Sequence, residues 1–167
     1  MRKIHENCAI LIPTFNDWQS LDKLISKINN NARKIARNVS IYVVNDGSTK
    51  KQNIKKKKFK KIKKIKLINL KENLGSQISI FLGLNQLKKM KINSDIIVMD
   101  SDGEDNPNKI PSMLSLLKDN QDKIIVASRT QRKETFFLKI LNMIRLFFTF
   151  LLTGRFMNYG NFSAFKS

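Results

Sequence analysis

Residues 95–107 read Asp-Ile-Ile-Val-Met-Asp-Ser-Asp-Gly-Glu-Asp-Asn-Pro, and this stretch decides the fold. Its first part, residues 96–99, is a run of apolar residues that favour strands, which predicts a central strand buried on both faces. Acidic side chains follow where the strand should end, at Asp100, Asp102 and Glu104. Open α/β sheets bind ligands at the carboxyl ends of their strands, so this stretch predicts a ligand site at that edge.

These three acids are spaced two residues apart, so a backbone that stays extended would project them on the same side. Clustered carboxylates repel one another unless a cation or hydrogen-bond donors neutralise them. Hard oxygen ligands suit Mg²⁺ or Mn²⁺, which bind one or two carboxylates and complete their shell with water and substrate phosphates. We therefore predict a metal–diphosphate site. The alternative is a polar loop that caps a helix opened by Pro107, with Asp105 or Asn106 as the N-cap.

Four more apolar runs predict strands, at residues 7–15, 39–44, 66–70 and 123–128. Pro13 is expected to break the first of them, because proline cannot donate to a strand ladder. Apolar residues at helical spacing predict helices from Asn16 or Asp17 to Ile35, over residues 73–90, and over residues 107–118. Strands that alternate with helices in this way predict a three-layer, Rossmann-like α/β fold: a mainly parallel sheet with helices on both faces.

The helix over residues 73–90 is expected to face the core with Ile78, Phe81, Leu82, Leu84 and Leu87, and its Gly83 permits close packing. Cys8 is the only cysteine, which excludes an internal disulfide and fits a reducing compartment. Because Cys8 lies in an apolar strand, we expect a buried structural thiol.

The net charge is +19, which favours anionic partners such as nucleic acid, acidic lipid headgroups or nucleotide diphosphates. Residues 50–66 carry much of it. This lysine run could bind phosphate backbones, but a solvated, weakly helical face is the preferred interpretation. Its single aromatic residue, Phe59, does not make the stacking platform of a single-strand binder, so nucleic acid is an unlikely partner. Neither a P-loop nor a Gly-x-Gly-x-x-Gly fingerprint occurs, which argues against an NTPase or a dinucleotide enzyme.

Residues 135–153 form a wide apolar surface around a narrow polar stripe of Lys139, Asn142, Arg145 and Thr149. Two cations near the middle make a bilayer span costly, by about 2.5–3.5 kcal/mol each. We therefore predict an amphipathic helix that lies in the interface of an anionic membrane. The alternative is a helix buried against a larger domain or a partner.

Several short motifs occur in order along nearly the whole chain. They are Ile-Pro-Thr-Phe-Asn-Asp at residues 12–17, Val-Asn-Asp-Gly-Ser-Thr at 44–49, Asn-Leu-Gly at 73–75, Met-Asp-Ser-Asp-Gly-Glu-Asp-Asn-Pro at 99–107, Ala-Ser-Arg at 127–129 and Gly-Asn-Phe-Ser-Ala-Phe at 160–165. With these motifs the chain resembles family 2 glycosyltransferases of the GT-A fold, particularly the dolichol- or polyprenyl-phosphate sugar transferases.

The resemblance implies a role for each matching position. The nucleotide-diphosphate is expected to bind at Pro13, Thr14, Phe15, Asp17, Asp46 and Asp100; the metal, Mg²⁺ or Mn²⁺, at Asp100, Asp102 and Glu104; and Asp102 and Arg129 are expected to be catalytic, Arg129 as a phosphate contact. Three positions depart from the family pattern. Asp17 stands where Glu is usual, Asn45 replaces the first of two acids, and Glu104 takes a place often held by Gln.

The activity implied is inverting, metal-dependent transfer of a sugar from a UDP- or GDP-linked donor to polyprenyl phosphate, by a cytoplasmic protein peripheral at the inner face of a membrane. The residues add one argument. After Asp122 the only acid is Glu134, and the only histidine is His5. A phosphate acceptor, with a second pKa of about 6, needs no general base, whereas a sugar hydroxyl does.

Two alternatives remain open. One is a transferase that acts on a glycan hydroxyl, with Glu134 or a residue of the missing segment as base. The other is a non-catalytic basic module that binds nucleic acid or anionic membranes. For the domains we expect a nucleotide-sugar-binding core at residues 1–134, the interface helix at 135–153, and at 154–167 the start of an acceptor-side segment. Family members usually continue beyond the position of Phe165, so we expect that this segment is truncated.

Overall fold

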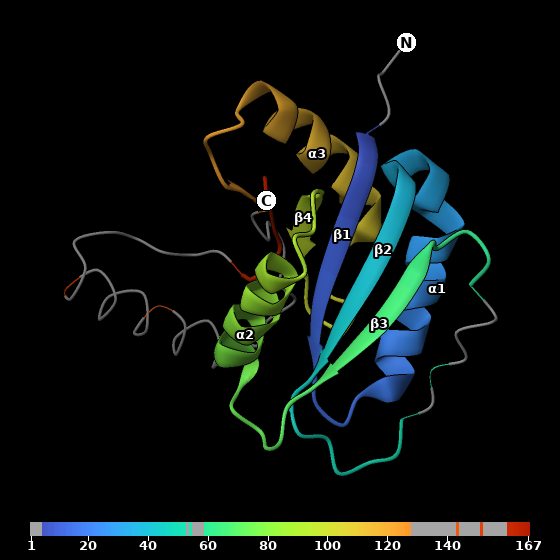
Figure 1. The fold of residues 1–167 in the computed structure, drawn as a ribbon, viewed down its shortest axis with the longest axis vertical. Coiled ribbons are helices and arrows are strands. Elements are labelled where there is room, and N and C mark those ends of the chain that lie inside the picture. The colour runs from blue at the N-terminus through green and yellow to red at the C-terminus, as the bar shows by residue number, and fades with distance from the viewer. Residues whose placement is uncertain (1–4, 53, 55–58, 128–142, 144–150, 152–159) are drawn as a thin grey trace.

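The computed structural model describes residues 5–52, 54, 59–127, 143, 151 and 160–167, and a six-stranded sheet forms its centre (Figure 1). The strands are β1 His5–Thr14, β2 Ala36–Asn45, β3 Lys64–Asn69, β4 Asp95–Val98, β5 Ile125–Val126 and β6 Ser163–Phe165. Their order across the sheet is β3-β2-β1-β4-β6-β5. The β1–β2, β2–β3 and β1–β4 pairs are parallel, and β6 is antiparallel to β4 and β5. The predicted mainly parallel sheet is confirmed.

The strand β6 is the one that the sequence pattern did not predict. It comes from the end of the chain and lies between β4 and β5, where Ala164 pairs with Ile97 on one side and with Ile125 on the other. Three residues are too few for an alternating pattern to stand out. The strand predicted at residues 123–128 is also shorter than expected: within the described chain only Ile125–Val126 is extended in the sheet.

Pro13 does not break β1, contrary to the expectation, because it is the paired partner of Val44 in β2. Leu11 directs its carbonyl towards β4 and accepts the N–H of Met99, whereas the Thr14 carbonyl faces β2 and accepts the N–H of Asp46. The side to which a residue's backbone N–H and C=O groups point alternates along a strand, so those positions of Pro13 face β4, as they do in Leu11. The paired part of β4 has already ended there, and the missing N–H of proline costs no ladder bond.

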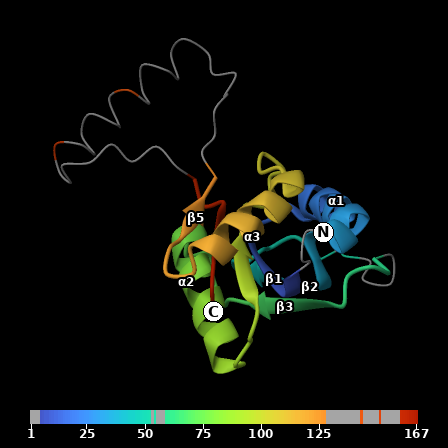
Figure 2. The same cartoon turned by 90° about the horizontal axis from the view of Figure 1, so that it is seen from above.

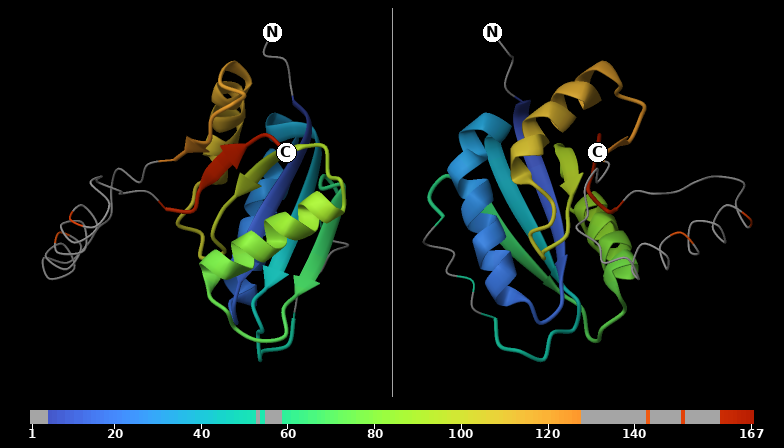
Figure 3. Two further views of the ribbon diagram at one scale, coloured as in Figure 1. Left: turned by 60° about the vertical axis from the view of Figure 1, so that its left-hand side comes forward. Right: turned by 180° about the vertical axis from the view of Figure 1, so that it is seen from behind.

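Helices cover both faces of the sheet, as predicted. On one face lie α1 Trp18–Ile35 and α3 Ile110–Asp119, the latter preceded by the 3₁₀ turn η2 Pro107–Lys109 (Figure 2). On the other face α2 Ser76–Lys89 crosses the strands (Figure 3). Asp17 is the N-cap of α1 and accepts the Ser20 N–H, and Asn106 is the N-cap of η2 and accepts the Asn108 N–H. Both caps are among the residues expected from the sequence.

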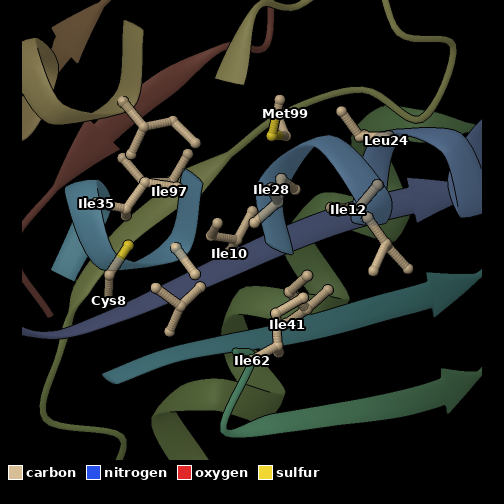
Figure 4. Close-up of a cluster of buried hydrophobic side chains, with 14 of the residues drawn as sticks. Cys8, Ile10, Ile12, Leu24, Ile28, Ile35, Ile41, Ile62, Ile97 and Met99 are labelled. Atoms are coloured by element: carbon tan, nitrogen blue, oxygen red, sulfur yellow. The ribbon is translucent and has the colours of Figure 1, made fainter. Parts of the chain in front are cut away.

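The main core lies between the sheet and the α1–α3 layer (Figure 4). Its fully buried members include Ile10 and Ile12 of β1, Leu24 and Ile28 of α1, and Met99. Cys8 belongs to the same cluster and is 1% exposed, so the predicted buried thiol is confirmed. Burial raises the pKa of the Cys8 thiol above its ordinary value, and the nearby carboxylate of Asp95 raises it further.

The inward face of α2 agrees with the prediction for Leu87 and for Leu84, which packs partly buried against the core, but not for Ile78 and Phe81. Ser79, Gly83 and Leu87 are buried, whereas Ile78 is 48% and Phe81 62% exposed. Gly83 explains which face of α2 is buried. A Cβ there would lie 2.7 Å from Val44 Cγ2 and 2.9 Å from Leu11 Cδ1, so the helix rests on the sheet through this residue. Because Ser79 and Leu87 are four residues from Gly83, they share its face. Ile78 and Phe81 are therefore turned away from the core.

The described part of the lysine run at residues 50–66 is not helical. It follows an irregular path to β3, with Phe59 4% and Ile62 8% exposed in the core while Lys60 and Lys61 are exposed to solvent. Of the predicted interface helix, residues 135–153, the structure describes only Met143 and Leu151, both helical and 67% exposed; the rest lies outside the described residues, as does Arg129. Across the described ranges, no helix is both long and apolar enough to span a bilayer.

Candidate nucleotide-sugar site

The order in which strands are added to the sheet reverses at β1, which lies between β2 and β4. From β1 it adds β2 and β3 on one side, then returns to place β4 on the other side of β1. The crevice outside the carboxyl ends of two such strands is where open α/β sheets bind ligands. Here those ends are Thr14 of β1 and, just beyond β4, Asp100.

The loop after β1 is joined to the loop after β2 by four hydrogen bonds. The Asn16 N–H donates to Ser48 Oγ (N–O distance 2.9 Å), and Asn16 Oδ1 accepts the Lys50 N–H (2.8 Å) and the Thr49 hydroxyl (3.3 Å). Trp18 Nε1 donates to the Lys50 carbonyl (2.9 Å). Asn16 adopts a φ of 57°, a left-handed conformation that asparagine tolerates better than most residues. The two loops therefore form one preorganised wall.

Four of the predicted nucleotide-binding residues lie on or beside this wall. Phe15 is 43% exposed, so its ring is open to a ligand. Asp17 is partly buried and caps α1. Pro13 is buried within β1, and Thr14 is 3% exposed and accepts the Asp46 N–H through its carbonyl. The side chain of Phe15 is thus more open than those of the other three.

Asp46 is 3% exposed, and the sequence did not reveal its structural contacts. Its Oδ1 accepts the Leu74 N–H (2.8 Å) and its Oδ2 accepts the Gly75 N–H (2.9 Å), so the carboxylate ties the end of β2 to the loop before α2. Gly47 lies against the same loop with a φ of 66°, and a Cβ there would come within 2.3 Å of the Glu72 carbonyl carbon. This close packing explains the Asp-Gly pair. A nucleotide contact for Asp46 stays a prediction.

The acidic loop after β4 turns rather than continuing as a strand. Gly103 has a φ of 84°, and Asp102 Oδ1 accepts the Glu104 N–H (2.9 Å). The extended backbone that would have aligned the three acids therefore ends at Val98. Asp100 is half-buried, while Asp102 and Glu104 are exposed. Among the described residues, no three side chains of His, Cys, Asp or Glu gather closely enough to hold a metal ion together.

Two residues that were not among the predicted site residues hold Asp100 in place. Asp105 is 2% exposed, and its Oδ2 accepts the Asp100 N–H (2.9 Å). Asn161, just before β6, donates from Nδ2 to Asp100 Oδ1 (2.9 Å) and accepts at Oδ1 the Gln77 amide of α2 (2.8 Å). Asn161 thus links the first turn of α2 to the end of β4. Its separation of 61 residues from Asp100 left no local signal, although the surrounding motif is one that the family resemblance had marked.

The donor set fits a divalent cation in part. Asp100 and Asp102 supply hard carboxylate oxygens at the switch point, and Mg²⁺ or Mn²⁺ needs only one or two carboxylates when substrate phosphates and water supply the rest. The fit rests on two acids, because no three gather among the described residues.

A doubly wound sheet with carboxylates at its switch point is the arrangement of a three-layer α/β domain that binds ligands at that edge, and its structural neighbours have the GT-A fold. A mannosyltransferase from Pyrobaculum calidifontis, solved in complex with GDP-Man and Mn²⁺, superimposes with a TM-score of 0.57 at 16% identity, over 95% of this chain and 44% of that one. S. aureus TarS 1–349 in complex with UDP-GlcNAc gives a TM-score of 0.52 at 19% identity, over 77% and 37%. At these identities the likeness concerns the fold alone.

The chain belongs to glycosyltransferase family 2, because the family model Glycosyl transferase family 2 matches residues 9–165. A dodecaprenyl-phosphate galacturonate synthase of Rhizobium johnstonii is 26% identical over 133 residues, 78% of this chain and 38% of the relative. An undecaprenyl-phosphate 4-deoxy-4-formamido-L-arabinose transferase of Photorhabdus laumondii is 26% identical over 156 residues, 91% of this chain and 46% of the relative. The chain therefore spans less than half the length of these relatives.

Proposed function

We propose that this chain transfers a sugar from a UDP- or GDP-linked donor to polyprenyl phosphate at the inner membrane surface, with inversion and with Mg²⁺ or Mn²⁺. The observation that carries the proposal is the position of Asp100 and Asp102 at the switch point of a family 2 domain. The names of two relatives, which specify dodecaprenyl- and undecaprenyl-phosphate, support the acceptor class.

The donor's nucleotide lies along the wall formed by the loops after β1 and β2. Its base stacks on Phe15, the exposed aromatic side chain at this edge. Hydrogen bonds of Asn16 and Trp18 already hold the loop after β1 against Ser48 and Lys50. Nucleotide binding therefore has to order this loop very little, which lowers its entropic cost. Arg129, which lies outside the described residues, would contribute a charge-assisted contact to the diphosphate.

Asp100 and Asp102 would hold the divalent cation, which when bound supplies a Lewis acid for the departing diphosphate. Asn161 and Asp105 are positioning residues: they bond the side chain and the backbone of Asp100, respectively, and so fix its orientation.

A phosphate oxygen of the acceptor attacks the anomeric carbon from the face opposite the diphosphate. The new bond joins that carbon to the acceptor oxygen, and the bond to the diphosphate breaks with its electron pair, releasing a nucleoside diphosphate. At neutral pH the acceptor phosphate, with a second pKa of about 6, is already ionised, so no residue has to remove a proton.

Calorimetric titration with UDP and GDP, with and without Mn²⁺, tests the donor site. Binding should tighten in the presence of Mn²⁺, and Asp100→Asn and Asp102→Asn should each remove most of that gain. The matched control is Asp119→Asn, an exposed acid at the end of α3, which should bind as the wild type does. If Asp102→Asn retains the full Mn²⁺ effect, the proposed metal role of Asp102 is wrong.

The acceptor is tested by turnover of a panel of UDP- and GDP-sugars with a short, water-soluble polyprenyl phosphate, beside soluble glycans as hydroxyl acceptors. The proposal expects transfer to the polyprenyl phosphate with inverted anomeric configuration in the product. Transfer to glycans alone would support the hydroxyl-acceptor alternative instead. A chain that binds acidic polymers but turns over no nucleotide-sugar would support a non-catalytic module.

A further inference from the structure

The outer face of α2 carries large apolar side chains where a helix on a soluble domain would carry polar ones. Phe81 is 62%, Ile78 48% and Leu74 38% exposed, the last just before the helix begins. At about 100° per residue, Ile78 and Phe81 lie roughly opposite Gly83, the residue through which α2 rests on the sheet. These two side chains therefore point away from the sheet, and Leu74 is exposed at the start of the same helix. We call these three residues the α2 stripe.

Cations continue the stripe along the same helix. Lys88 and Lys89 form the last turn of α2, and both are exposed. Lys88 lies seven residues beyond Phe81, so it falls on the same side of the helix. Apolar side chains flanked by lysines on one helix face are typical of a segment that lies in a membrane interface, with its apolar groups in the acyl boundary and its cations among headgroups.

The stripe also begins beside the candidate site. Leu74 is held by Asp46 through its N–H, and Gln77 on the first turn bonds Asn161, which bonds Asp100. A lipid-linked acceptor has to bring its phosphate to the donor sugar bound at this site while its hydrocarbon chain stays in the bilayer. The apolar end of α2 is therefore next to the place where bilayer and site have to meet.

We propose that the outer face of α2 docks on an anionic lipid bilayer, with Leu74, Ile78 and Phe81 in the acyl boundary and Lys88 and Lys89 among the headgroups. This inference rests on the proposed function, because a polyprenyl-phosphate acceptor is what brings the protein to a bilayer. It does not depend on the predicted membrane helix at residues 135–153. The whole chain's charge of +19 draws the protein to the same surface.

Vesicle flotation tests the docking face. Phosphatidylcholine vesicles that contain phosphatidylglycerol should carry the full-length protein upward, and Ile78→Glu with Phe81→Glu should lower the partition coefficient roughly tenfold or more. The matched control is Leu116→Glu on α3, where a 53% exposed leucine lies on the opposite face of the sheet. Equal flotation of the α2 variant and the wild type would overturn the proposal.

A probe at position 81 shows what covers the stripe. Phe81→Cys carries an environment-sensitive fluorophore, and the native thiol of Cys8, being 1% exposed, stays unlabelled in the folded protein. The emission should shift to shorter wavelength when anionic vesicles are added, and lipids with a spin label at the acyl boundary should quench it. A blue-shifted emission without vesicles, unchanged by their addition, would mean that another segment or a second copy covers the stripe, and would overturn the proposal.

Turnover of the water-soluble polyprenyl phosphate without vesicles separates this proposal from the one on which it rests. The Ile78→Glu, Phe81→Glu variant should match the wild type there and fall behind when the acceptor is embedded in vesicles. If the wild type transfers no sugar yet floats through the α2 stripe, the proposed function fails and the docking face stands. If it transfers sugar and the variant is unimpaired with embedded acceptor, the docking face fails alone.

Discussion

The two helices that cover the opposite faces of β1 are held in different ways. In α1 one face is polar and the other is buried, with Leu21, Leu24, Ile25 and Ile28 at most 1% exposed. In α2 the buried face is narrow and consists of Ser79, Gly83 and Leu87, while large apolar side chains point outward. The first helix follows the pattern of a helix that only packs. The second rests on the sheet through Ser79, Gly83 and Leu87 and leaves Ile78 and Phe81 largely exposed.

The two helices also differ in how their first turns are held. Asp17, the residue next to α1, caps it with its own side chain. The N-cap of α2 is Gly75, which makes no side-chain cap bond, and the approach to this helix is held instead by Asp46 from the end of β2. The start of α1 is thus fixed by a neighbouring residue in the sequence, as in a helix that serves only to pack. A start fixed by another strand couples α2 to the ligand edge of the sheet.

The largest expected effect is on the packed side of α1. Leu24→Ala removes a side chain that is 1% exposed in the main core, so we expect the free energy of unfolding to fall by about 2–5 kcal/mol. Urea unfolding followed by circular dichroism measures it. A loss below about 1 kcal/mol would mean that α1 is not packed as tightly as its burial indicates.

Asp46→Ala should give the next largest effect, because it leaves the N–H groups of Leu74 and Gly75 without their carboxylate acceptor. Hydrogen bonds to a charged group contribute about 1.5–3 kcal/mol, so we expect a loss of unfolding free energy in that range. Asp46→Asn retains one acceptor oxygen and should lose less. Equal stability of Asp46→Ala and the wild type, measured by urea unfolding, would contradict the tether between β2 and α2.

These contacts also show how far the sequence could lead. The strands β1, β2 and β4 and the main helices were predictable because apolar residues repeat at strand or helix spacing over long segments. The strand β6 was not, because three residues carry no period. Neither was the bond from Asn161 to Asp100, since the two residues come together only when β6 enters the sheet beside β4.

The candidate site was predictable in its place but not in its details. The end of β4 could be identified as a ligand edge from the acids that follow it, but not the turn in which Asp102 bonds the Glu104 N–H. In α2, apolar residues occur on nearly every side, so the inward face predicted from the pattern is correct for Leu87 and wrong for Ile78 and Phe81. The close approach at Gly83 selects it, and that approach depends on Leu11 and Val44 from two other strands.

A smaller effect is expected at the start of α1. Asp17→Ala removes the acceptor of the Ser20 N–H and should lower the free energy of unfolding by about 1 kcal/mol. Asp17→Ser keeps a capping oxygen and serves as the control. If Asp17 also contacts the nucleotide, as the family resemblance implies, the serine variant should regain stability without regaining UDP or GDP affinity, which calorimetry separates from the unfolding measurement.

The smallest effect is expected on the outer side of α2. Phe81→Ser replaces a side chain that is 62% exposed, so the free energy of unfolding should change by no more than about 0.5 kcal/mol, although the residue removed is a large aromatic one. Set beside Leu24→Ala, this pair of variants measures the difference between the two helices directly. A loss above about 2 kcal/mol for Phe81→Ser would mean that the α2 stripe packs against another part of the protein, since only a buried aromatic side chain is worth that much. A near-zero change together with weaker vesicle binding would mean that the apolar surface serves the membrane rather than the fold.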